Sequence, residues 1–196
     1  MDQDLDNLMA LLRKDHPDLS AWIVVCANDR AVDPVRLLIH DRLGGILPRV
    51  EGIQSYLNRK IGEKEPLHPV PADEELLYLI QFIAEEFPGE KTPARLAANM
   101  LPLITRLAEY QVGKETIAGS ERFTSEQWDQ LEQYLETAKA FRWWLSRKHL
   151  FLAALEASRF DEILPGDREI FIGLPELTPS RERFYRKIRN ERLFID

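Results

Sequence analysis

Two short apolar segments near opposite ends of the chain constrain its fold more than any other feature. They are residues 21–26 (AWIVVC) and 169–174 (EIFIGL), and a long helical stretch separates them. A nearly continuous apolar run of this length is typical of a strand buried on both faces of a parallel sheet, because a half-exposed strand alternates apolar and polar residues. Each run is followed by a polar or proline-containing turn and an amphipathic helix. The pattern predicts an α/β fold with a small, parallel-sheet, Rossmann-like core.

The segments around the first run predict helices and one weak strand. Residues 2–14 have apolar side chains at helical spacing, with acids in the first turn and bases in the last. After the run, Asp33 is expected to cap a helix that begins at Pro34 and ends at Gly44. Residues 46–50 are expected to form an edge or irregular strand, because Pro48 cannot donate a hydrogen bond. A short helix is expected over 53–61.

A large α-helical insertion is expected over residues 66–161, and the α/β core over 1–65 and 162–196. Helices are predicted over 73–87 and over 93–110, where Thr92 is the expected cap and Pro102 should kink or split the helix. A further helix begins with Thr124 or Ser125 as its cap and runs to about residue 158, with a break near 147–149 as the alternative. The tryptophans of this helix, Trp128, Trp143 and Trp144, are assigned to the core rather than to stacking platforms.

The end of the chain predicts one more helix and one more strand. Thr178 is the expected cap of a helix with Pro179 at its first position, and residues 192–196 predict a third buried strand. Because the chain stops within this apolar segment, we expect it to be an N-terminal piece of a longer architecture or a shortened relative of one. An uncovered sheet edge would then expose unpaired backbone N–H and C=O groups, with which a second polypeptide can pair.

Composition limits the functional class. Of the 196 residues, 44% are hydrophobic, which is enough for a core, and no apolar run approaches the ~18 residues of a membrane span. The acidic start does not resemble a secretory signal, and Cys26 is the single cysteine, so a cytoplasmic protein with a buried thiol is expected. The formal net charge of −7 argues against a dedicated nucleic-acid coat, although it leaves room for a local basic face.

The motifs of common catalytic sites are missing. No Gly-x4-Gly-Lys-Ser/Thr phosphate loop occurs, and the GEKT segment at 89–92 lacks the upstream glycine. The four histidines are scattered, so neither a metal nor another cofactor is expected. Asp29 lacks the second aspartate of the phosphatases that use an aspartate nucleophile, and there is no Gly-x-Ser-x-Gly elbow. We therefore expect no enzymatic activity, while a small hydrolase with a spatially assembled site stays open as a third hypothesis.

Two features remain as candidate binding elements. One is the turn Asn28-Asp29-Arg30, which follows the first strand at the end where open α/β sheets place ligands. The other is the last helix, which combines Phe184 and Tyr185 with six basic residues: Arg181, Arg183, Arg186, Lys187, Arg189 and Arg192. Basic and aromatic side chains together can follow a nucleic-acid backbone and stack on bases. The structural alternatives are a solvated turn and a solvated helix whose apolar side faces the sheet.

Three stretches resemble the AddB-type relatives of superfamily I (UvrD-like) helicases, which have degenerate ATPase motifs and act in bacterial double-strand-break repair. They are WIVVCANDRA at 22–31, LPRVEGIQSYL at 47–57 and EIFIGLPELTP at 169–179. They are similar to the Ia region, the segment leading into the Ib region, and a later strand with its following loop. The resemblance implies that the core is a 1A-like domain and the insertion a helical 1B-like subdomain.

The same resemblance implies a path for single-stranded DNA and excludes two activities. It places Asn28, Arg30, Arg49, Gln54 and Ser55 near the DNA strand. The Walker A segment, the Walker B acidic pair, the second helicase domain and the nuclease domain are absent from this sequence. A member of the family without these parts is expected neither to hydrolyse ATP nor to cleave DNA.

The leading hypothesis is a non-catalytic, helicase-derived domain that binds single-stranded DNA weakly or docks onto a helicase or nuclease subunit in DNA repair. Its expected DNA contacts are Asn28, Arg30, Arg49, Gln54, Ser55, Arg183, Arg186 and Arg189. The alternative is an acidic, helical protein–protein interaction module that binds no nucleic acid and has an apolar patch on helices 73–110. Neither hypothesis involves a membrane or a small-molecule substrate.

Overall fold

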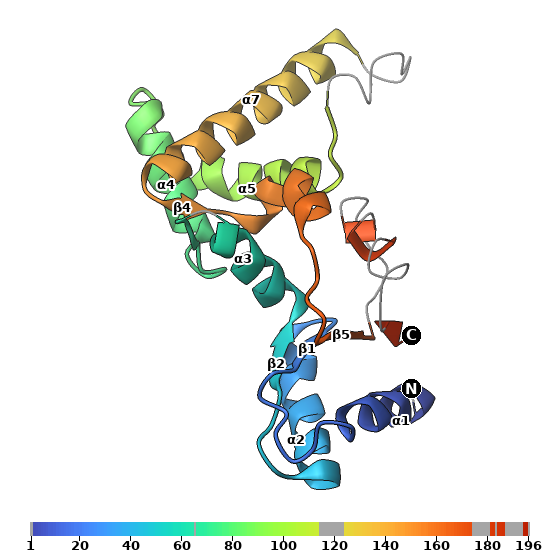
Figure 1. Cartoon of the computed structure of the whole chain (residues 1–196). Coiled ribbons are helices and arrows are strands. Elements are labelled where there is room, and N and C mark those ends of the chain that lie inside the picture. Colours follow the sequence, from blue (N-terminus) through green and yellow to red (C-terminus); the bar gives the residue numbers. More distant parts are fainter. Residues whose placement is uncertain are drawn as a thin grey trace. The chain divides into compact units, whose positions relative to one another are not determined.

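The computed structural model describes residues 2–64, 66–113, 124–173, 181–182, 184–186 and 194–195 (Figure 1). The protein is mixed α/β and divides into two compact units. Of the described residues, unit 1 contains those up to 60 and those from 162 onward except Arg181, and unit 2 contains 61–161 and Arg181. The first boundary therefore falls within a helix, at 60/61, whereas the sequence predicts it at 65/66; the second falls at 161/162.

Unit 1 is built on a small parallel sheet in which the two apolar runs are neighbours. Strand β1 (Ile23–Cys26) lies between β2 (Arg49–Gly52) and β5 (Glu169–Ile172), and the short β6 (Phe194–Ile195) pairs with β5. All of these pairings are parallel, with Ile23 opposite both Arg49 and Glu169. The prediction of a small parallel sheet is confirmed.

The edge strand β2 begins later than the sequence predicts. Ile46 forms only an isolated bridge with Asp18, and Pro48 precedes the strand instead of lying within it. The displacement agrees with the missing N–H of proline, since a strand that starts at Arg49 loses no ladder hydrogen bond. β2 lies at the edge of the sheet, as expected.

Helices α1 (Asp2–Leu12) and α2 (Val32–Leu43) cover one face of this sheet. The core between them contains the side chains that alternate along β1 and β5 to that face, including Val24, Cys26 and Ile170, together with Leu8 and Ile39 from the helices. These five side chains have no exposed surface. Helix α3 (Ile53–Lys64) contributes Tyr56 to the opposite face, where the ring packs edge-to-face on Phe171 at 5.2 Å between centroids. Helices therefore contribute to both faces.

The start of α2 differs from the expected one. Asn28 accepts a hydrogen bond from the Ala31 amide at 3.1 Å and caps a 3₁₀ turn, η1 (Asp29–Ala31). Because the chain enters helical geometry in this turn, α2 starts at Val32, before the proline. Asp33 lies inside the first turn and bonds Arg36 at 3.1 Å, so the prediction that Asp33 is the cap is wrong.

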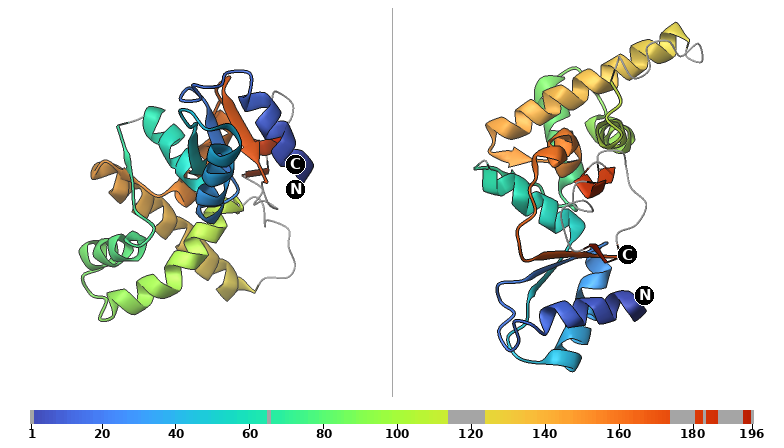
Figure 2. Two further views of the ribbon diagram at one scale, coloured as in Figure 1. Left: turned by 90° about the horizontal axis from the view of Figure 1, so that it is seen from below. Right: turned by 45° about the vertical axis from the view of Figure 1, so that its right-hand side comes forward.

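Unit 2 is helical with a two-stranded ribbon. Its described residues include helices α4 (Glu75–Glu86), α5 (Pro93–Glu109) and α7 (Ser125–Arg147), and α5 packs against both of the others (Figure 2). The short strands β3 (His68–Pro69) and β4 (Leu150–Phe151) pair in parallel, and the 3₁₀ segment η2 (Ala153–Glu162) follows. The core is aromatic at its centre, where Phe82 packs on Phe141 and Trp144.

The structure tests the predicted ends of α5 and α7 and the predicted effect of Pro102. Thr124, one of the two predicted caps, is the N-cap of α7 and forms a reciprocal capping box with Gln127. Thr92 occupies the cap position before Pro93, as predicted, although its side chain makes no capping hydrogen bond. Pro102 lies within a continuous α5, so the expected split of this helix is wrong. The amphipathic packing of α5, which buries Met100 and Ile104, outweighs the loss of one hydrogen bond. The alternative of a break near 147–149 holds, because α7 ends at Arg147.

The two adjacent tryptophans of α7 have different surroundings. Trp144 is 3% exposed and donates a hydrogen bond to Glu85 at 2.7 Å, whereas Trp143 is 58% exposed. Neighbouring residues on a helix point about 100° apart, so packing one ring in the core leaves the other outside. The assignment of Trp143 to the core is therefore wrong.

Part of the C-terminal prediction lies outside the described residues. This holds for Thr178, Pro179, Arg183, Lys187, Arg189 and Arg192. Residues 181–182 and 184–186 are helical, and the buried Phe184 packs 6.0 Å from Phe171. In the predicted third strand, residues 194–195 form β6.

Candidate functional site

Four of the eight candidate DNA-contact residues lie at the carboxyl edge of the unit 1 sheet. The turn with Asn28 and Arg30 follows β1, and the first turn of α3 with Gln54 and Ser55 follows β2. Because β1 and β2 are parallel with Cys26 opposite Gly52, these two segments leave the sheet side by side. Asn28, Arg30 and Ser55 are exposed, and Gln54 is half-buried. The edge therefore presents amide, hydroxyl and guanidinium groups together.

Close packing between the two segments fixes the shape of this edge. Ser55 Oγ lies 3.5 Å from Asp29 Oδ1, to which it donates a weak hydrogen bond. A Cβ on Gly52 would overlap Asp29 Oδ1 and would lie 3.1 Å from the carbonyl carbon of Asn28. A side chain at position 52 would displace the Asp29 carboxylate and crowd the backbone of the η1 turn, so glycine is favoured where β2 passes beneath this turn.

The electrostatics of the edge are mixed. Two exposed bases, Arg30 and Arg36, are accompanied by the exposed acids Asp29 and Asp33, and Arg36 is paired with Asp33. α3 begins directly after β2, and the first N–H groups of a helix carry partial positive charge that favours phosphate oxygens. The arrangement can hold a phosphate-containing ligand through few, weak contacts.

Arg49 does not belong to this edge. It is the first residue of β2, so it lies at the amino end of the strands, about 10 Å along β2 from Gly52. Its guanidinium pairs with Glu51 Oε2 at 2.9 Å. Arg49 is therefore separated along β2 from Asn28, Arg30, Gln54 and Ser55, with which the resemblance groups it near the DNA path.

Arg186 and the last helix are described only in part. Arg186 is exposed and pairs with Glu182, one helical turn before it, at 2.6 Å. Tyr185 and Phe184 are buried, so neither ring is available for base stacking. Arg183 and Arg189 lie outside the described residues.

A buried network of charges lies beneath α3, and the sequence patterns did not identify it. Glu51 on β2 and Glu169 on β5 are 6% and 5% exposed and occupy the sheet face that also carries Phe171. Arg59 bonds Glu51 at 2.7 Å, and Lys60 bonds Glu169 at 2.7 Å. Glu51 lies within β2, Glu169 begins the apolar β5, and the bases lie at adjacent positions of one helix. This pattern is the signal that could have indicated the network.

Glu169 contacts donors from two different segments of the chain. It accepts hydrogen bonds from Tyr56 Oη at 2.7 Å and from the Gly166 amide at 2.6 Å, besides its contact with Lys60. Burial acts to raise the pKa of Glu169, but the bonds from Lys60 and Tyr56 outweigh it, so the pKa lies below its ordinary value. Burial, reinforced by the bond to Glu169, raises the pKa of Tyr56, which therefore stays protonated. Because Glu169 and Tyr56 are already bonded to each other and Glu169 also to Lys60 and Gly166, they suit an anchor for α3 better than a catalytic acid–base pair.

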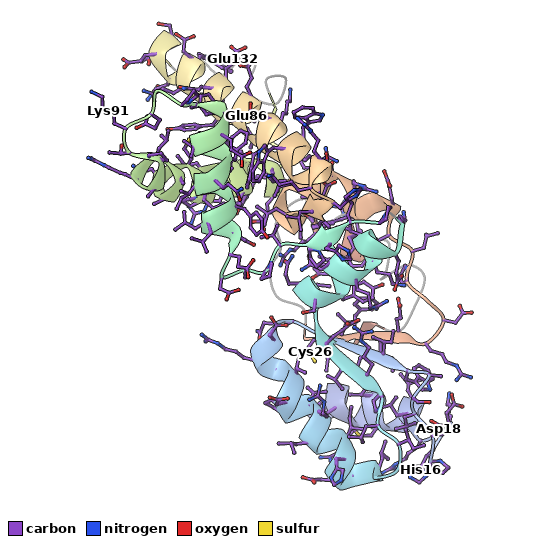
Figure 3. The ribbon with its side chains drawn as sticks, turned by 90° about the vertical axis from the view of Figure 1, so that its left-hand side faces the viewer. His16, Asp18, Cys26, Glu86, Lys91 and Glu132 are labelled. Atoms are coloured by element: carbon purple, nitrogen blue, oxygen red, sulfur yellow. The ribbon has the colours of Figure 1, made fainter. Side chains whose placement is uncertain are left out.

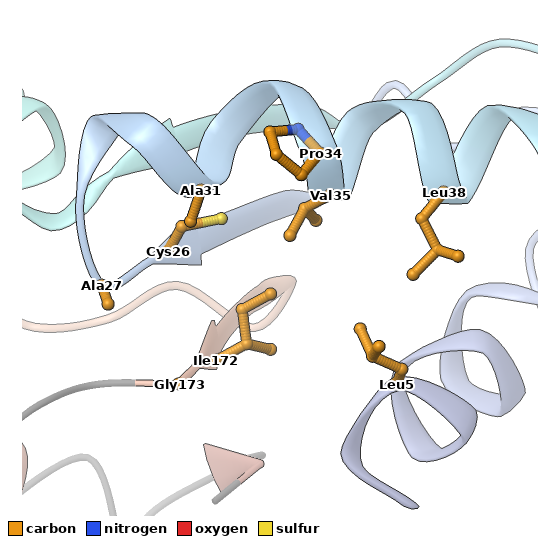
Figure 4. A pocket seen from close by; sticks show the side chains of 9 residues that line it. All are labelled: Leu5, Cys26, Ala27, Ala31, Pro34, Val35, Leu38, Ile172 and Gly173. Carbon is orange, nitrogen blue, oxygen red and sulfur yellow. The ribbon is translucent and has the colours of Figure 1, made fainter. Parts of the chain in front are cut away.

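An apolar cavity of about 320 Å³ lies between α1, α2 and the carboxyl ends of β1 and β5 (Figure 4). Leu5, Leu38, Cys26 and Ile172 are among its lining side chains. Burial raises the pKa of the Cys26 thiol to about 11. At neutral pH Cys26 is thus a protonated, buried thiol, which is a poor nucleophile.

Among the described residues, no group of three or more His, Cys, Asp and Glu side chains is arranged to hold a metal ion. In the same part of the chain, no helix combines the length and the apolar character needed to cross a membrane. A scan against protein-family models finds no match for this chain, and a search of curated proteins finds no significant match.

Proposed function

We propose that the chain is a non-catalytic, helicase-derived domain with a Rossmann-like core that binds single-stranded DNA weakly at the carboxyl edge of its sheet. The observation that carries this proposal is the convergence of Asn28, Arg30, Gln54 and Ser55 from two segments that are adjacent only in the folded chain. Arg30 supplies positive charge, and the amide and hydroxyl groups supply neutral hydrogen bonds. The nearby acids Asp29 and Asp33 keep the affinity low.

Fluorescence anisotropy with a labelled single-stranded oligonucleotide tests this proposal. We expect binding at low salt that weakens steeply toward physiological salt, because phosphate contacts release counterions. Arg30→Glu should weaken binding and flatten the slope of log K against log salt by about 0.7 for each phosphate that the variant no longer neutralises. Arg95→Glu makes the same charge change at an exposed position of α5 and serves as the control.

No binding by the wild-type chain at low salt would contradict the proposal. Equal weakening by Arg30→Glu and Arg95→Glu would show that net charge alone, and not the carboxyl edge, governs the affinity.

A second candidate function is docking onto a protein partner, and exposed apolar side chains on α4 and α5 favour it. Leu77 and Phe87 are 62% and 48% exposed, and Leu103 on α5 is also exposed. A photo-crosslinking amino acid at position 77 should then give one discrete adduct in cells, whereas the same probe at Glu86 should give none. Glu86 is exposed on the same helix and serves as the matched position (Figure 3). Equal labelling from both positions would contradict a specific apolar contact.

A further inference from the structure

Trp143 presents a large aromatic surface to solvent on α7. Two nearby aromatic residues of the same helix, Phe141 and Trp144, are buried in the core and only 1% and 3% exposed, whereas Trp143 is 58% exposed. Ser146 Oγ donates to the Trp143 carbonyl at 2.7 Å, so the backbone here is ordinary helix. A single exposed apolar residue needs no special explanation, so further observations must decide whether this ring has a role.

The first such observation is the basic side chains along the same helical face. Lys139, Trp143 and Arg147 are spaced four residues apart and are all exposed, and they are called the aromatic–basic stripe below. The Arg147 guanidinium lies 4.8 Å from the centroid of the Trp143 ring, a cation–π distance. The stripe extends about 12 Å along the helix axis from Lys139 to Arg147.

The second observation is the local charge. Residues 137–155 contain four bases and no acid and are adjoined by Glu136 and Glu156, in a chain whose formal net charge is −7. Two of these bases are engaged within unit 2, since Arg142 pairs with Glu156 at 2.6 Å and Lys148 with Glu85 at 3.6 Å. The other two, Lys139 and Arg147, are the ends of the stripe. The positive charge therefore flanks the exposed ring on both sides.

A partner that fits this pattern has flat apolar faces alternating with negative charges. Single-stranded nucleic acid has this chemistry, because every base has a π-face and every linkage carries a phosphate. We propose that the aromatic–basic stripe is a stacking platform for a base of single-stranded DNA. In this arrangement the base stacks on the face of the Trp143 ring opposite Arg147, while Lys139 and Arg147 contact the phosphates on either side.

This inference rests on the proposed function, that the chain binds single-stranded DNA, and adds a contact in unit 2 to the one in unit 1. The test compares the full chain with its Trp143→Leu and Trp143→Phe variants in anisotropy titrations. Two labelled probes are used, an oligothymidylate and an abasic oligonucleotide of equal length. They carry the same phosphates, so their difference reports base contacts.

The wild-type chain should bind oligothymidylate more tightly than the abasic probe. Trp143→Leu should lower the affinity for oligothymidylate about tenfold, as expected when one base is no longer stacked, and should change abasic binding little. Trp143→Phe should keep most of the affinity. Trp143 is exposed, so these variants should fold, and circular dichroism checks that they do.

Charge variants test the flanking positions. Lys139→Glu should weaken binding to both probes, whereas Lys91→Glu, at an exposed residue between α4 and α5, should weaken them much less (Figure 3). Equal effects of the two lysine variants would overturn the phosphate contact assigned to Lys139.

The outcomes separate the two proposals. If the wild-type chain binds and Arg30→Glu weakens binding while Trp143→Leu changes nothing, the stacking platform is overturned and the proposed function stands. Equal wild-type affinity for the two probes also overturns the platform, since no base contact then contributes. If the wild-type chain binds neither probe at low salt, the proposed function and the platform both fail.

Discussion

Glu169 is a buried carboxylate that connects the sheet to α3 through three different donors. Lys60 and Tyr56 approach it from α3, and the Gly166 amide approaches from the turn before β5. A buried charge of this kind is costly unless each of its oxygens is satisfied. Because the donors come from two segments, we infer that Glu169 positions α3 over the sheet.

Replacing Glu169 by Gln should therefore destabilise the protein. Glu169→Gln keeps the shape of the side chain but leaves the Lys60 ammonium, which is only 15% exposed, without its partner. We expect a loss of about 2 kcal/mol in the free energy of unfolding at pH 7, measured by urea denaturation. Glu86→Gln, at an exposed position, should change it by less than about 0.5 kcal/mol. Similar losses for both variants would contradict the anchoring role.

The difference in stability between wild type and Glu169→Gln should depend on pH. The pKa of Glu169 is lower in the folded protein than its ordinary value of 4.5, so the unfolded chain takes up the proton first as the pH falls. The stabilisation is present in full above about pH 4.5 and is lost as the pH falls through the folded-state pKa. The difference in the free energy of unfolding between wild type and Glu169→Gln should consequently decrease as the pH is lowered. A gap that stays constant from pH 7 to pH 3 would contradict this linkage.

Helix α7 is defined by local signals at its two ends. At the start, the Thr124 amide donates to Gln127 Oε1 at 2.9 Å, and the Gln127 amide donates to Thr124 Oγ1 at 3.3 Å. At the other end, His149 adopts a left-handed φ of 58°, which turns the chain out of the helix and into β4. The apolar periodicity that predicts one helix from about residue 124 to 158 continues past His149, but the backbone geometry at His149 ends the helix before that residue.

Removing the N-terminal cap should weaken α7 without affecting its core face. We expect Thr124→Ala to lower the free energy of unfolding by about 1 kcal/mol, because the Gln127 amide loses its acceptor. Hydrogen exchange measured by mass spectrometry should rise in the first turns of α7. Ser125→Ala, which leaves the capping box intact, should have a smaller effect; an equal effect of the two changes would show that the cap is unimportant.

Among the described residues, units 1 and 2 each contain a hydrophobic core, and these two cores share no residue. One core surrounds Val24 and Ile170 in unit 1, and the other surrounds Phe82 and Phe141 in unit 2. Truncating a side chain in one core leaves a cavity in that unit alone.

Local destabilisation should therefore be confined largely to one unit. Phe141→Ala should destabilise unit 2 by about 3–5 kcal/mol, and native-state hydrogen exchange should accelerate in α4, α5 and α7 much more than in β1 and β5. Val24→Ala should give the reverse pattern. Uniform acceleration over both units in either variant would show that they unfold as one cooperative body.

The sequence alone was sufficient for features that depend on neighbouring residues. The two apolar runs form strands β1 and β5, and Thr124, one of the two predicted caps, is the N-cap of α7. Both are local, since a strand's apolar character and a cap's hydrogen bonds are decided within a few residues. The small parallel sheet follows from those runs and the helices between them.

Only the tertiary structure decided which distant residues meet. Strand register places Arg49 at one end of the sheet and Asn28 and Ser55 at the other, although all three are expected DNA contacts. Packing of the Trp144 ring in the core turned Trp143 outward, and long-range pairing brought Glu169 beneath α3. The local sequence determines which elements form, but register and burial depend on contacts between residues far apart in the chain, which a local pattern does not encode.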